Sequence, residues 1–153
     1  MQFKRRDILG LGASFSVLVM VGTASNAETQ PGIYAEDGVA IDGTDPVAYF
    51  TQGRPVAGDP AITHDWMGAT WRFASTANKE AFVADPVAYA PQFGGYCAWA
   101  VSEGYTASTT PDAWSIVDDK LYLNYSRRIQ RRWERDIPGH IEKGNANWPK
   151  VLG

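Results

Sequence analysis

The stretch THDWMGATWRFASTANKEAFVADPVAY, residues 63–89, contains the turn and helix signals on which the predicted fold depends. Apolar and polar residues alternate on both sides of residues 65–68, which is typical of a β-hairpin, and its second strand is expected over residues 69–74. Ser75 then provides a helix N-cap, and the helix should end before Asp85. The apolar side chains expected to face inward from this helix are Ala77, Ala81 and Phe82.

The helix-start signal Asp-Pro occurs twice, in the identical pentapeptides at residues 45–49 and 85–89. Aspartate is a good N-cap and proline suits the first helical position, so each copy predicts a short capped helix. The sequences around the two copies differ, which argues against a structural repeat. A short strand at residues 39–41 is expected before the first copy, and the glycine and proline content of residues 51–62 predicts a loop.

The C-terminal third of the chain predicts a second hairpin and a C-terminal helix. Two alternating strands flank residues 118–119. Ser126 can cap a helix that carries Ile129 and Trp133 on one face, and Pro138 interrupts this helix. Local hairpins with flanking helices indicate the α+β class, here a small single domain with short Asp-Pro-capped helices. The large side chains expected in its core are Trp71, Phe73, Phe82 and Tyr89.

The N-terminus has the features of a cleavable export signal. Lys4, Arg5 and Arg6 precede an apolar run that is too short to span a bilayer, and small residues lead to a cleavage site after Ala27. The adjacent arginines resemble a twin-arginine signal, and the alternatives are a general secretory signal and a retained membrane anchor. We therefore expect residues 1–27 to be removed and the protein to be periplasmic, with no transmembrane segment after cleavage.

The remaining chain is expected to contain a flexible segment, residues 28–37, and one domain, residues 38–153. The full sequence of 153 residues has 14 Lys and Arg against 17 Asp and Glu, and its formal net charge of −3 argues against nucleic-acid binding. All six Trp and seven Tyr follow residue 27, which is enough for a dense core. The single cysteine, Cys97, cannot form an intramolecular disulfide, so the core must supply the stability.

Residues 71–89 resemble the core motif of the YHS domain family. The positions of that motif are filled here by Trp71, Phe73, Ser75, Phe82, Pro86 and Tyr89. The resemblance extends over nearly all of residues 38–152 and implies an exported bacterial YHS subgroup. Metal-handling members of the family have cysteines at the positions of Ala48, Ala74 and Asn78. The usual soft-metal site of the family is therefore absent.

Cys97, His64 and Met67 are the candidate metal ligands. Thiolate, imidazole and thioether together suit copper, whereas tetrahedral zinc would normally need more histidines or cysteines. Gly94 and Gly95 would permit the preceding loop to fold over the turn that holds His64 and Met67. In the alternative interpretation Cys97 is a buried packing residue, His64 lies on the surface and Met67 lies in the core.

A basic face on the C-terminal helix is the candidate surface for an acidic protein or for anionic lipid headgroups. The residues that form it are Arg127, Arg128, Arg131, Arg132 and Arg135. The alternative is a solvated face that offsets the acidic remainder of the chain.

The sequence contains no catalytic motif of a hydrolase and no phosphate-binding glycine loop, so no catalytic residue is assigned and an enzyme is the least favoured class. The leading prediction is an exported YHS-type domain that binds a small ligand, with a copper-like metal ion held through Cys97. The alternative is a non-catalytic periplasmic interaction module in which Cys97 is a packing residue.

Overall fold

The structure is a computed structural model that describes residues 29–153, so the predicted export signal lies outside the described residues. Helices and strands alternate in one small domain, which confirms the predicted α+β class. The strands are β1 Ala35–Glu36, β2 Val39–Ala40, β3 Asp59–Trp66, β4 Ala69–Phe73, β5 Trp114–Val117 and β6 Lys120–Leu123. The α-helices are α1 Pro46–Thr51, α2 Thr76–Ala84, α3 Pro86–Tyr89, α4 Ala98–Ser102, α5 Arg127–Glu134 and α6 Ile137–Asn147. None of the helices within residues 29–153 is long and apolar enough to cross a membrane.

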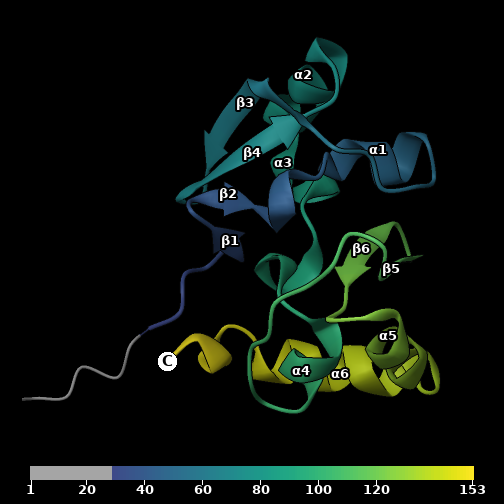
Figure 1. Cartoon of the computed structure of the whole chain (residues 1–153). Coiled ribbons are helices and arrows are strands. Elements are labelled where there is room, and N and C mark those ends of the chain that lie inside the picture. The colour runs from purple at the N-terminus through teal and green to yellow at the C-terminus, as the bar shows by residue number, and fades with distance from the viewer. Residues whose placement is uncertain (1–28) are drawn as a thin grey trace, which may run out of the picture.

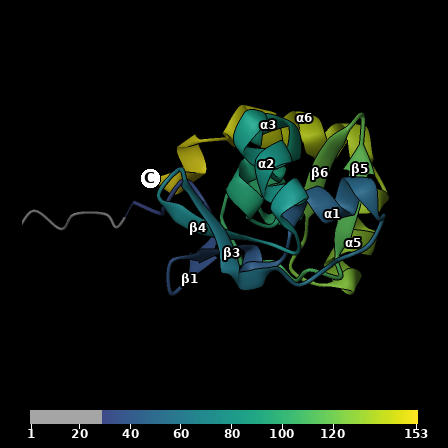
Figure 2. The ribbon, with the colours of Figure 1, turned by 90° about the horizontal axis from the view of Figure 1, so that it is seen from above.

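The strands form two separate sheets. The first has the order β1-β2-β4-β3, in which β2 pairs with β4 in parallel and the other pairs are antiparallel. The second is the β5–β6 hairpin. Figure 1 shows the four-stranded sheet in the upper half of the molecule and helices α4, α5 and α6 in the lower half. Seen from above, α2 and α3 lie between the β3–β4 hairpin and the β5–β6 hairpin (Figure 2).

Both predicted hairpins are confirmed, and each closes through a two-residue turn with positive φ. In the first hairpin these residues are Met67, with φ 53°, and Gly68, with φ 79°. In the second they are Asp118, with φ 51°, and Asp119, with φ 61°. Positive φ at both central positions matches the right-handed twist of the flanking strands, which explains why these short turns join the strands.

The predicted helix caps are also present. The Ser75 hydroxyl accepts a hydrogen bond from the Asn78 N–H at 3.1 Å, and the Ser126 hydroxyl accepts one from the Ile129 N–H at 3.1 Å. The break predicted at Pro138 separates α5 from α6, and proline occupies the first turn of the new helix. Local capping signals therefore set the helix boundaries.

The structure corrects several sequence-based expectations. The sequence predicts a flexible segment at 28–37 outside the domain, but within its described part, residues 29–37, Ile33 and Tyr34 are buried in the core and β1 pairs with β2. The loop expected at 51–62 ends early because β3 begins at Asp59. Ala77 is exposed and Tyr89 only half-buried, since α2 and α3 each turn a narrow face to the core.

Two aromatic clusters form the core. In the upper half, the fully buried Phe82 ring lies 5.1 Å from Trp71 and 5.2 Å from Phe73, centroid to centroid. In the lower half, Tyr122 lies 5.1 Å from the ring of Trp133. Aromatic pairs at these separations contribute beyond the burial of their area, and both clusters belong to one continuous hydrophobic core.

The buried carboxylate of Asp45 joins three elements of the upper half. Its Oδ1 accepts hydrogen bonds from the N–H groups of Val47 at 2.8 Å and Ala48 at 3.2 Å, which caps α1. Its Oδ2 accepts hydrogen bonds at 2.8 Å from the Ala74 N–H, after β4, and from the Asn78 side-chain amide in α2. Asp45 is 0% exposed, and this donor set replaces the water that a buried carboxylate loses.

Replacing Asp45 by Asn tests this junction. The amide nitrogen would face one pair of N–H donors and could accept from neither, so the free energy of unfolding should fall by about 3 kcal/mol in urea titrations. Asp85→Asn is the matched control, because Asp85 starts the same pentapeptide but is exposed and accepts one 3.3 Å bond. Asp85→Asn should lower the free energy of unfolding by less than about 1 kcal/mol, since Asn is an equally good helix N-cap. Equal losses of unfolding free energy in the two variants would contradict the role of Asp45 in joining these elements.

Candidate functional site

Cys97 lies immediately before α4 and is 1% exposed. Its backbone N–H donates to the Ala107 carbonyl at 3.0 Å, which ties it to the following loop. Its sulfur accepts a hydrogen bond from the Tyr125 N–H at 3.3 Å, and its S–H donates to Asn124 Oδ1 at 3.5 Å. The thiol is therefore held between the start of α4 and the end of β6.

Asn124 fixes the orientation of this thiol. It is 0% exposed, and its Oδ1 also accepts a hydrogen bond from the Trp99 N–H at 3.0 Å. Both donors approach the carbonyl oxygen, which identifies that side of the amide as the acceptor. The Asn124 amide nitrogen has no hydrogen-bond partner in the described part of the chain.

The thiol lines a cavity of about 440 Å³, here called the Cys97 cavity. Four separate segments form its wall, and the lining residues are Cys97, Trp99, Ala100, Tyr105, Ala107, Tyr125, Ile129 and Arg132. The rings of Trp99 and Tyr105 meet edge to face at 6.2 Å. Tyr105 and Tyr125 are about half exposed, at 48% and 56%, so aromatic surface rims the cavity. Convergent apolar walls around a few polar groups are typical of small-ligand sites.

Burial disfavours the thiolate form of Cys97. Desolvation raises its pKa above the ordinary value of 9.0, while backbone N–H groups of Ala100, Tyr125 and Trp99 act in the opposite direction. The neutral S–H is also the form that donates to Asn124. Because thiolate is the nucleophile and the metal-binding form, this environment favours an unreactive thiol.

The structure does not bring His64 or Met67 to Cys97. His64 lies in β3, opposite Trp71, and its ring packs edge-on against Phe82 at 6.4 Å. Met67 is 62% exposed at the tip of the first hairpin, which also corrects its expected place in the core. Figure 1 shows β3 and α4 at opposite ends of the molecule. The predicted three-residue ligand set is therefore not assembled.

The glycine-containing loop does approach the hairpin turn, as its sequence permits. Phe93 and Gly94 line a small hollow of about 190 Å³ together with Met67 and Trp148. The Cys97 sulfur, three residues further along the chain, instead contacts the end of β6. Within residues 29–153 there is no group of three or more His, Cys, Asp and Glu side chains that could hold a metal ion.

The positions that the YHS resemblance assigns to metal-site cysteines lie around the Asp45 carboxylate. The backbone N–H groups of Ala48 and Ala74 and the side-chain amide of Asn78 all donate to it. In this chain, N–H donors surround the Asp45 carboxylate at the positions where metal-handling members of the family have cysteine thiols. A carboxylate surrounded by donors has no lone pair directed at a soft metal ion, so this region is structural in the present chain.

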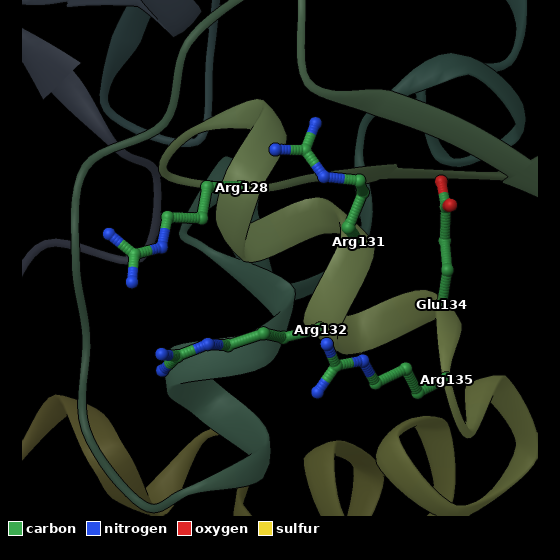
Figure 3. Close-up of a pocket in the computed structure, with 5 residues that line it drawn as sticks. All are labelled: Arg128, Arg131, Arg132, Glu134 and Arg135. Atoms are coloured by element: carbon green, nitrogen blue, oxygen red, sulfur yellow. The ribbon is translucent and has the colours of Figure 1, made fainter.

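The predicted basic face surrounds a second cavity, of about 520 Å³, here called the arginine cleft. Its lining residues are Arg128, Arg131, Arg132, Glu134 and Arg135. Figure 3 shows the side chains of Arg128 and Arg132 extending to the same side of α5, with Glu134 on the other side in this view. The structure thus groups four of the five predicted arginines, and Arg127 lines neither cavity.

Most residues that line the Cys97 cavity are not among the candidate metal ligands predicted from the sequence. Trp99 and Tyr105 lie in the same glycine-rich stretch as Cys97, so their proximity in the sequence was a usable signal. Asn124 and Tyr125 follow β6, and nothing in their local pattern indicates a contact with a thiol 27 residues earlier. Arg132 was predicted only as part of the basic face.

Comparisons of the chain with protein-family models, curated proteins and solved structures gave no match. The YHS resemblance therefore stays a prediction that rests on the motif residues themselves.

The protonation of Cys97 can be measured through its alkylation rate with iodoacetamide as a function of pH. Because burial raises the pKa, the midpoint of the rate profile in the folded protein should lie above that of the same chain unfolded in urea. Because the folded protein binds this proton more tightly than the unfolded chain, the contribution of Cys97 to stability is intact below the ordinary cysteine pKa and is lost as the pH rises through the raised pKa. A folded-state midpoint at or below that of the unfolded chain would show a reactive thiolate instead.

Proposed function

We propose that the protein is an exported YHS-type domain that binds a small organic ligand in the Cys97 cavity. The observation that carries this proposal is the cavity of about 440 Å³, walled by aromatic side chains from separate segments. Ligand sites in proteins commonly have volumes of about 300–1,000 Å³, so the cavity is large enough to enclose part or all of a small molecule.

The chemistry of the wall supports an apolar, flat ligand. Trp99, Tyr105 and Tyr125 offer aromatic rings, and Ala100 and Ile129 add apolar surface between them. Aromatic rings bind flat apolar molecules through stacked or edge-to-face contacts. The protonated thiol adds a small polarizable contact to this wall, and no covalent step is part of the proposal.

An organic ligand fits this cavity better than the copper ion predicted from the sequence. Of the three predicted donors only Cys97 lines the cavity. Copper sites in proteins use several imidazole and sulfur ligands, and the remaining lining side chains include neither. Copper binding stays a prediction, which metal analysis of the purified protein can test.

Binding of N-phenyl-1-naphthylamine, a neutral dye that fluoresces in apolar sites, tests the proposal. The full chain should bind it with saturation near one dye per protein. Ala107→Phe should abolish the signal, because the new ring would occupy the cavity. Ala77→Phe is the matched control, because Ala77 is exposed on α2, and it should bind as the parent does.

Thermal unfolding followed by circular dichroism shows whether Ala107→Phe is folded, and Ile129→Trp fills the same cavity from α5 if it is not. No saturable binding by the parent protein, or unchanged binding by a folded cavity-filling variant, would contradict the proposal. Cys97 would then be a packing residue of a non-catalytic interaction module.

A further inference from the structure

The arginines of α5 and of its C-cap lie close to one another along one helix. Arg127 and Arg128 occupy its first turn, next to the positive end of the helix dipole. Arg128 and Arg132 are four residues apart, as are Arg131 and Arg135, and like charges at this spacing repel. Arg131 and Arg132, in the last turn, interact favourably with the helix dipole, but the repulsion between neighbouring arginines remains, and a bound anion would relieve it.

The arginine cleft and the Cys97 cavity are neighbours that share one residue. Arg132 lines both of them. Its guanidinium carbon lies 6.0 Å from the centre of the Trp99 ring, within the range of a cation–π contact. One side chain thus joins the aromatic wall to the cluster of positive charge.

We infer that the ligand of the Cys97 cavity is an amphipathic anion. Its flat apolar part lies against the aromatic wall, and its carboxylate, sulfonate or phosphate group is held at Arg132 in the arginine cleft. The inference rests on the proposed function and adds the chemical class of the ligand. Guanidinium groups bind such anions through paired N–H donors, and Arg128 is placed to add a second positive charge.

The charge of the protein supports an anion that enters at this face. The full sequence is acidic, with a net charge of −3, yet the cleft has four arginines and one glutamate. The local field therefore attracts an anion toward the mouth of an otherwise apolar cavity, and away from the acidic remainder of the surface.

Two dyes with the same phenylnaphthylamine body test the inference. N-phenyl-1-naphthylamine is neutral, and 8-anilinonaphthalene-1-sulfonate adds one sulfonate. In fluorescence titrations at low salt, Arg132→Gln should weaken binding of the sulfonate about five- to tenfold more than binding of the neutral dye. Arg132→Lys should restore part of the loss, because it keeps the charge.

Arg127→Gln is the matched control, since this residue belongs to the same basic helix but lines neither cavity. It should leave both dyes unaffected. An equal loss of both dyes in Arg132→Gln would overturn the inference while the cavity itself stands as a binding site. Failure of the neutral dye to bind the parent protein would instead overturn the proposed function.

Co-sedimentation with phosphatidylglycerol vesicles separates a dissolved ligand from a membrane surface. If the Cys97 cavity and the arginine cleft together bind a dissolved anion, we expect no co-sedimentation of the protein with the vesicles at physiological salt. Vesicle binding that Arg127→Gln and Arg132→Gln reduce to the same extent would overturn the inference, because the whole basic face and not the shared residue would then be the determinant.

Discussion

A single buried carboxylate organises the upper half of this domain. Asp45 accepts hydrogen bonds from four nitrogen donors that belong to α1, α2 and the end of β4. These elements bring together the aromatic cluster around Phe82, which packs against Trp71 and Phe73. An unpaired carboxylate would be costly at this depth, so the donors must all be in place for the elements to dock.

The hydrogen bonds to Asp45 also limit where the protein can bind a ligand. The Asp45 region is closed, because its acceptor oxygens are already bonded to protein donors. The lower half differs, since the hydrogen bonds among Cys97, Asn124 and Trp99 hold a thiol at the wall of an open cavity. The Asp45 region therefore supports the fold, whereas the Cys97 cavity lies between α4, α5 and the end of β6.

Local signals predicted the fold well because they act within a few residues. The caps at Ser75 and Ser126 and the tight turn at residues 118–119 each depend on neighbours in the chain, so they can be read from the sequence. The Asp45 junction and the Cys97 cavity could not be read in this way. Asp45 bonds Asn78, 33 residues away, and the direction of the Cys97 side chain depends on β6.

We propose that the Cys97 cavity binds a ligand while the Asp45 region only supports the fold. Backbone amide NMR during a titration with 8-anilinonaphthalene-1-sulfonate can distinguish these two roles. If the cavity is the binding site, the largest shift changes occur at the amides of Trp99, Tyr105 and Tyr125, with the Ala74 amide unmoved. Changes centred on Ala74, or scattered without saturation over the whole domain, would contradict it.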